Sequence, residues 1–261
     1  MKNHYIIPYP GNKRLECKSI YELIKDNIND IEYIVEPFCG TSAFSYYISQ
    51  LHPKKFKYIL NDNNKQLIEL YNIFKDENKT NELITRLNTH LPINDKEEYN
   101  KLCKLNTLDG YIIQNKIYNI RPGLYPQGKK ISEDIFNNMK KAPIVDFLRN
   151  EDITILNNDY NEVLNKYLNN PKALIFLDPP YIFTNNTWYS NPSIKIYEWL
   201  CTEELNKYKS LLTVCVENNF FIKHIFKKYK QFTYEKLYQP NKKKTEHIFI
   251  INKLIDNNKI I

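Results

Sequence analysis

Short runs of apolar residues alternate along the chain with stretches in which apolar residues recur every three or four positions. The runs predict β-strands and the stretches predict α-helices, an alternation typical of βα units in an α/β domain. The predicted strands are Tyr33–Glu36, Phe56–Leu60, Ile153–Leu156, Ala173–Leu177, Leu211–Val216 and His247–Ile251. A helix is predicted from Ser42 to Leu51. The run from Ala173 to Leu177 is apolar throughout, which favours a central parallel strand buried on both faces.

About ninety residues separate the second predicted strand from the third, too many for a single connection. From Lys65 to Leu91 apolar residues fall at helical spacing, and from Thr107 to Ile131 the sequence is aromatic, basic and rich in turn residues. We therefore predict an α/β domain formed by residues 1–64 and 151–261, into which a second, mostly helical subdomain of residues 65–150 is inserted.

Composition narrows the classes of protein that fit. Hydrophobic residues make up 42% of 261, enough for a sizeable core, and no apolar run approaches the 18 residues of a membrane helix. The N-terminus lacks the apolar stretch of a signal peptide, so we expect an intracellular protein. The 5 Cys and 5 His show no metal-ligand spacing, which argues against a zinc site or any other metal site.

Glycine and charge add two further indications. Only 5 residues are Gly, so each is expected where another side chain does not fit. The net charge of +7 is compatible with a nucleic-acid partner, and equally with a codon bias toward Lys.

The strongest candidate for chemistry is Asp178-Pro179-Pro180-Tyr181, which follows the predicted buried strand. Ligands of open α/β sheets bind at the carboxyl ends of strands. Each proline fixes its own φ and lacks an N–H, so the Asp178 carboxylate and the Pro179 carbonyl are held in place. These two acceptors suit the two hydrogens of an amino group, and Tyr181 adds a flat face for a planar ring. The structural alternative is a proline-rich turn with a capping Asp.

Other polar residues follow the remaining strands. The turn from Glu36 to Ser42 contains Gly40 and is followed by a predicted helix. Glycine-containing turns in this place let a nucleoside cofactor approach the backbone. Ordinary strand-to-helix turns often contain one glycine too. Asp62 ends the next strand, where an acid suits ribose hydroxyls, and Asp159 after the third strand suits an adenine amino group. Either acid alone would more often cap a helix. The ordered set favours a shared cofactor pocket.

In this order the motifs resemble those of the Dam-type DNA adenine methyltransferases, the alpha group of amino-methyltransferases that use S-adenosylmethionine. The resemblance covers nearly the whole chain. The matching segments are Tyr9-Pro10-Gly11-Asn12-Lys13 for the N-terminal element, Pro37-Phe38-Cys39-Gly40 for the cofactor loop, Asn61-Asp62-Asn63-Asn64 for the ribose element, Asn158-Asp159-Tyr160 for the adenine element, Asp178 to Tyr181 for the catalytic tetrapeptide and Glu246 to Asn252 for the closing strand. Ser42 departs from the pattern, because the family's cofactor loop has a second glycine there.

The resemblance implies a Rossmann-like methyltransferase sheet with an inserted target-recognition subdomain, S-adenosylmethionine as cofactor and double-stranded DNA as substrate. It implies catalytic roles for Asp178, Pro179 and Tyr181. The implied cofactor-binding residues are Tyr9, Gly11, Lys13, Pro37, Phe38, Cys39, Gly40, Thr41, Ser42, Asp62, Asp159, Tyr160 and Asp178. The expected DNA contacts are Arg121, Lys129 and Lys130 in the insertion, and Lys242, Lys243 and Lys244 in a loop before the last strand.

The expected reaction is transfer of a methyl group to N6 of an adenine flipped out of the duplex. A cognate restriction endonuclease is a candidate partner, and the chain is expected to be a monomer or a homodimer. Two other functions stay open. One is an RNA adenine methyltransferase, against which the insertion and the N-terminal element argue. The other is a catalytically silent homologue that binds nucleic acid or protein, suggested by Ser42 and by the loose match of Tyr118 to Tyr125 to the family's recognition segment.

Overall fold

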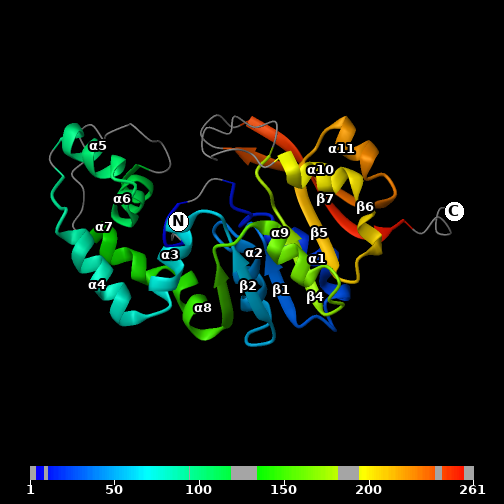
Figure 1. Cartoon of the computed structure of the whole chain (residues 1–261), viewed down its shortest axis with the longest axis horizontal. Helices are drawn as coiled ribbons and strands as arrows, with labels where there is room; N and C mark the ends of the chain where they lie inside the picture. Colours follow the sequence, from blue (N-terminus) through cyan, green and yellow to red (C-terminus); the bar gives the residue numbers. More distant parts are fainter. Residues whose placement is uncertain are drawn as a thin grey trace. The chain divides into compact units, whose positions relative to one another are not determined.

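Figure 1 shows the fold of the chain as a computed structural model. The structure describes residues 4–8, 11–93, 95–118, 134–181, 194–238 and 243–255. The chain divides into two compact units. The first unit comprises Met1–Cys17 and Gly40–Asn158, and the second comprises Lys18–Cys39 and Asp159–Ile261.

The first unit combines a pair of parallel strands with a series of helices. Strand β2 (Lys57–Asn61) lies beside β3 (Asp152–Leu156), in a register that places Leu60 opposite Ile155. The helices are α2 (Ala43–Leu51), α3 (Lys65–Phe74), α4 (Glu77–Asn88), α5 (Lys96–Lys104), α6 (Leu108–Tyr118), α7 (Asp134–Asn137), the 3₁₀ helix η2 (Asn138–Lys141) and α8 (Ile144–Asn150).

The sequence shows why several of these helices begin where they do. Asn64, Asp76 and Asp95 precede α3, α4 and α5, and their side-chain oxygens accept a backbone N–H three residues on, at 3.0, 3.0 and 2.9 Å. Such N-caps satisfy donors that a helix leaves unpaired at its start. Within α6, Gly110 allows close packing against α5, because a Cβ there would lie 2.5 Å from the Leu102 carbonyl oxygen.

Residues 65–150 contain helices and no strand among the positions that the structure describes, which confirms the predicted helical character of this stretch. Its limits as a separate subdomain stay a prediction. These helices belong to the same compact unit as β2 and β3.

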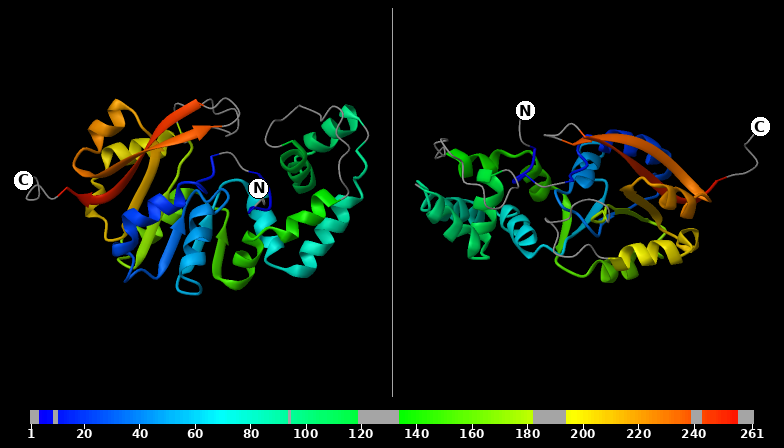
Figure 2. Two further views of the ribbon diagram at one scale, coloured as in Figure 1. Left: turned by 180° about the vertical axis from the view of Figure 1, so that it is seen from behind. Right: turned by 90° about the horizontal axis from the view of Figure 1, so that it is seen from above.

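The second unit contains the remaining strands. Strands β1 (Tyr33–Glu36), β4 (Ala173–Leu177) and β5 (Leu211–Glu217) are parallel, and β7 (Lys243–Leu254) and β6 (Tyr229–Tyr238) complete the unit with antiparallel pairings. In Figure 2 the pair β6 and β7 is drawn in orange and red. The helices are α1 (Cys17–Ile24), η1 (Lys25–Asn27), α9 (Tyr160–Tyr167), α10 (Ile194–Thr202), η3 (Leu205–Lys207) and α11 (Phe220–Ile225).

The seven strands follow the order β3-β2-β1-β4-β5-β7-β6. This mixed sheet, with helices connecting its parallel strands, confirms the predicted Rossmann-like α/β class. All five side chains of β4 are buried, as its uninterrupted apolar run predicts. Among the helices in the described ranges, none combines the length and the apolar character needed to cross a membrane.

All six predicted strands are present, with ends that shift by at most one residue except in the last strand. That strand begins at Lys243 rather than His247, so the expected loop position of Lys243 and Lys244 is wrong: both lie within β7. Strand β6 was not predicted. Among its described side chains only Tyr229 is buried, so the sequence lacks the apolar run or alternation that predicts a strand.

Candidate active site

The turn between β1 and α2 is buried and tightly constrained. Pro37, Cys39, Thr41 and Ser42 are buried, and Gly40 has a φ of 45°. Glycine adopts this left-handed conformation freely, which accounts for Gly40 in a chain that uses so little glycine. Ser42 also has a positive φ, 53°, which costs a residue with a Cβ about 1–2 kcal/mol.

Asp62 lies beside this turn in the first unit, as expected for residues of one pocket. Its Oδ2 accepts the Gly40 N–H at 3.0 Å, and its Oδ1 accepts the Asn64 N–H at 2.9 Å. The side chain is 7% exposed. Burial raises the pKa of the Asp62 carboxyl, and the two backbone hydrogen bonds, which lower the pKa, offset only part of this effect.

Two residues that the sequence did not single out complete this arrangement. The Tyr71 hydroxyl donates to the Gly40 carbonyl oxygen at 2.6 Å, and the Asn157 amide donates to the Asp62 carbonyl oxygen at 2.8 Å. Tyr71 lies 31 residues from Gly40 and Asn157 lies 95 residues from Asp62, so no local signal announces either contact.

The N-terminal element contributes a buried cation to the first unit. Lys13 is 3% exposed, and its Nζ donates to the Gly11 carbonyl oxygen at 3.3 Å. Gly11 has a φ of 75°, again a conformation that favours glycine. Tyr9, the third predicted residue of this element, lies outside the described residues.

The tetrapeptide at the end of β4 forms a bonded cluster within the second unit. The Tyr181 hydroxyl donates to Asp178 Oδ1 at 3.2 Å, and the Tyr197 hydroxyl from α10 donates to the Pro180 carbonyl oxygen at 3.0 Å. Tyr181 is buried, and its ring centroid lies 5.0 Å from that of His247 on β7. The structure therefore holds Tyr181 through its hydroxyl as well as its ring. No sequence motif identifies Tyr197 or His247 as neighbours of the tetrapeptide.

The adenine element shows a helix cap and an aromatic contact. Asp159 precedes α9, and its Oδ1 accepts the Asn161 N–H at 2.9 Å, so its carboxylate does cap a helix. The Tyr160 ring packs against Phe38 with centroids 5.1 Å apart. Phe38 and Tyr160, two predicted cofactor residues more than a hundred positions apart, are thus in contact.

Most of the predicted DNA contacts, Arg121, Lys129, Lys130 and Lys242, lie outside the described residues. On β7, Lys244 Nζ lies 2.9 Å from Glu235 Oε2 on β6, with both side chains exposed. Exposed pairs of this kind contribute about 0–1 kcal/mol, so Lys244 can exchange its partner for another anion at little cost.

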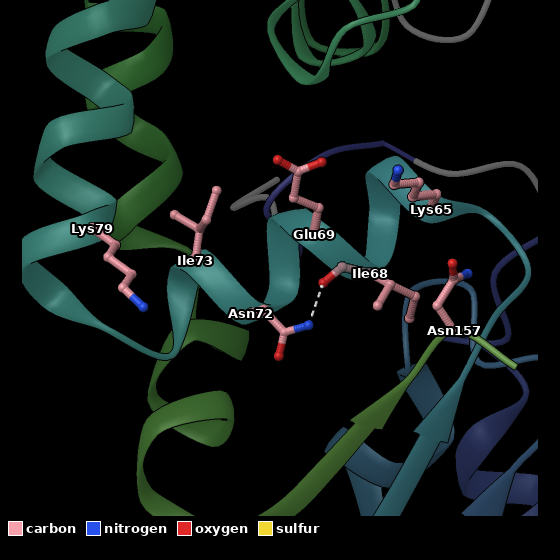
Figure 3. Close-up of a pocket in the computed structure, with 7 residues that line it drawn as sticks. All are labelled: Lys65, Ile68, Glu69, Asn72, Ile73, Lys79 and Asn157. Carbon is pink, nitrogen blue, oxygen red and sulfur yellow. Dashed lines mark hydrogen bonds between the residues drawn. The ribbon is translucent and has the colours of Figure 1, made fainter.

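Figure 3 shows a pocket beside α3, lined by Lys65, Ile68, Glu69, Asn72, Ile73, Lys79 and Asn157. Within it the Asn72 amide donates to the Ile68 carbonyl oxygen at 3.1 Å. None of the predicted catalytic or cofactor-binding residues lines this pocket, although Asn157, whose amide donates to the Asp62 carbonyl oxygen, does. In the part of the chain that is described, no group of three or more His, Cys, Asp or Glu is arranged to hold a metal ion.

Comparison with known proteins supports the interpretation of these motifs. Residues 9–125 match the family model of the D12 class N6 adenine-specific DNA methyltransferases. The matched segment contains the Gly11 and Lys13 element, the turn around Gly40 and the Asp62 carboxylate, and it ends before Asp178. A search of the curated proteins gave no match.

Proposed function

We propose that the chain, of which residues 9–125 match the D12 class N6 adenine-specific DNA methyltransferases, methylates adenine in DNA. We further propose that its methyl donor is S-adenosylmethionine and that its target is an adenine flipped out of duplex DNA. The hydrogen bond from the Gly40 N–H to Asp62 carries this proposal. It joins the turn and the acid that the sequence assigns to one cofactor, and both lie within the segment that matches the family.

The residues present in the first unit fit this cofactor. Each Asp62 oxygen accepts one backbone N–H and keeps a second lone pair, so the carboxylate can also accept ribose hydroxyls. Buried Lys13 supplies a positive charge for the carboxylate of the methionine part. We assign further contacts to Tyr9, Gly11, the residues from Pro37 to Ser42, Asp159, Tyr160 and Asp178. When bound, S-adenosylmethionine supplies an electrophilic methyl group on a sulfonium.

In the proposed mechanism, the tetrapeptide positions the amino group that accepts the methyl. The Asp178 carboxylate and the Pro179 carbonyl accept the two N6 hydrogens, and the Tyr181 ring stacks on the flipped base. A carboxylate offers about four lone-pair positions, and the Tyr181 hydroxyl donates to one of them, on Oδ1. Flipping costs a few kcal/mol, and the rate then depends mainly on positioning and electrostatics.

Basic side chains are proposed to hold the DNA backbone. Arg121, Lys129 and Lys130 would neutralise phosphates beside the recognised sequence, and Lys242, Lys243 and Lys244 would do so from the β6–β7 hairpin. Affinity for DNA should therefore fall as salt is raised. The activity would take place where cellular DNA is held, in a monomer or homodimer, with or without a cognate restriction endonuclease.

The proposal is tested by incubating the purified chain with tritium-labelled S-adenosylmethionine and unmethylated duplex DNA or RNA. Mass spectrometry of the digested nucleosides should identify N6-methyldeoxyadenosine. Asp178→Ala should abolish transfer while leaving cofactor binding partly intact, and Asp152→Ala, at an exposed position on β3, should leave transfer unchanged. Full turnover by Asp178→Ala, or methylation confined to RNA, would contradict the proposal.

A further inference from the structure

Tyr181 can stack on a planar base only if the plane of its own ring is fixed. Its hydroxyl donates to Asp178 Oδ1 at 3.2 Å, and this bond anchors the far end of the side chain. The phenol oxygen lies on the axis about which the ring turns, so the ring can rotate without moving this oxygen. Torsions of this kind have broad minima. The hydrogen bond by itself therefore does not set the ring plane, and a group beside the ring is needed to do so.

His247 is placed to set this plane. Its ring centroid lies 5.0 Å from that of Tyr181, and the two ring planes are inclined by 50°. His247 is 0% exposed and belongs to β7, which pairs with β5 on one side and with β6 on the other. In these pairings it lies opposite Glu217 and opposite Tyr234. Because its backbone is held from both sides and its side chain is buried, the His247 ring has little freedom to move away from Tyr181.

A third ring supports His247 from β6. The Tyr234 ring stacks on the His247 ring with centroids 5.5 Å apart and planes inclined by 21°. Ring pairs at such distances, across strands or elsewhere, correspond to a factor of about 2–12 in an equilibrium or a rate. Tyr181, His247 and Tyr234 thus form a row of three rings. The row connects the tetrapeptide at the end of β4 to β6, the last strand in the order of the sheet.

We propose that His247 is a positioning residue for methyl transfer, which holds the Tyr181 ring in the plane that stacks on the target adenine. The inference rests on the proposed function and extends it, because it adds a residue of β7 to the groups that serve the tetrapeptide. Without the His247 ring, the Tyr181 ring would turn, and the adenine amino group would spend less time aligned with the methyl group. Transfer rates depend steeply on such alignment. The loss would fall on kcat, because it arises after the DNA has bound.

Steady-state kinetics with unmethylated duplex DNA tests this inference on the full chain. His247→Val removes the ring and introduces a side chain that suits a strand. Its kcat should fall about 3–10-fold, while KM for DNA and the affinity for S-adenosylhomocysteine, the demethylated cofactor, stay within about twofold. His247→Phe keeps a flat ring and should restore kcat to within about twofold of the original chain. Tyr234→Leu removes only the supporting ring, at a partly exposed position, and should lower kcat about 2–3-fold.

A double-mutant cycle separates positioning from a general loss of structure. Tyr181→Leu removes the ring on which His247 is proposed to act, so adding His247→Val to Tyr181→Leu should lower kcat by less than about twofold. Asn252→Ala is the matched control on the same strand, because it breaks three buried hydrogen bonds to backbone groups. It should lower the unfolding temperature and leave kcat of the folded protein within about twofold.

The inference is overturned by full kcat in His247→Val, or in Tyr234→Leu should the first variant not fold. Equal losses from His247→Val with and without the Tyr181 ring would also overturn it, as would a loss in His247→Phe as large as in His247→Val. An original chain that transfers no methyl group to DNA would overturn the proposed function itself. The inference alone fails when the original chain is active and the His247 variants give one of the contrary results.

Discussion

Asp62 offers the sharpest test of how the cofactor side of the site is built. Its carboxylate accepts two backbone N–H groups, from Gly40 at 3.0 Å and from Asn64 at 2.9 Å, and it is nearly inaccessible to water. Asp62→Asn keeps the shape of the side chain but turns one acceptor into an NH₂ donor. One of the two backbone N–H groups then faces a donor and loses its partner.

A buried donor without a partner costs about 1–3 kcal/mol. Removing the ionised carboxylate recovers part of this cost, because burial disfavours the charged form. We expect a net loss of about 1–2 kcal/mol at neutral pH, or roughly 2–8 °C in unfolding temperature for a chain of this size. Affinity for S-adenosylhomocysteine should fall as well. Asp152→Asn, on the exposed side of β3, serves as the control and should change neither quantity.

The dependence on pH gives this prediction a second readout. The folded pKa of Asp62 lies above its usual value of 3.8, so the stability it contributes is fully present below that value and is lost as pH rises through the folded pKa. The stability difference between the original chain and Asp62→Asn should therefore shrink as pH rises from about 4 toward 7. A difference that grows over this range, or no difference at any pH, would refute the reasoning.

Two further substitutions test the second unit. Tyr181→Phe keeps the ring but removes the hydroxyl that donates to Asp178 at 3.2 Å. Steady-state kinetics should show a kcat lower by about 10-fold and a KM for DNA that is nearly unchanged. An unchanged kcat would mean that the hydroxyl does not position Asp178. Asn252→Ala removes three buried hydrogen bonds to backbone groups, of 3.0, 3.2 and 3.0 Å, and should lower the unfolding temperature by more than about 6 °C. The control Asn72→Ala, at an exposed position, should lower it by less than about 2 °C. Equal shifts in the two variants would contradict this account.

The sequence predicts the sheet best where burial is complete. Strand β4 is placed to the residue, because five consecutive apolar side chains are followed at once by Asp178-Pro179-Pro180. Strand β6 escapes prediction because only Tyr229 is buried among its described side chains, so polar and charged residues interrupt the apolar pattern. The early start of β7 is missed for a related reason, since its first residues are charged and pair only with β6.

Site residues, like strands, are predicted where the sequence around them carries a local pattern. The motifs at strand ends predict Gly40 and Asp62 as neighbours, because each has a local signature that places it beside a cofactor. Tyr71 and His247 carry no such signature: one lies within a helix and the other within a strand, and only the fold brings them to the turn and the tetrapeptide. The family's glycine at the position of Ser42 predicts the positive φ found there. That the Ser42 hydroxyl is buried without a hydrogen bond in the described residues depends on the packing around it and is not predictable from the sequence.

The most direct test of the central claim is to map modified bases in the DNA of cells that express the chain. Expression in a host free of adenine methylation should place N6-methyladenine at one recurring sequence, and the same host expressing Asp178→Ala should show none. An absence of N6-methyladenine with the original chain present as folded protein, or equal modification with Asp178→Ala, would contradict the account.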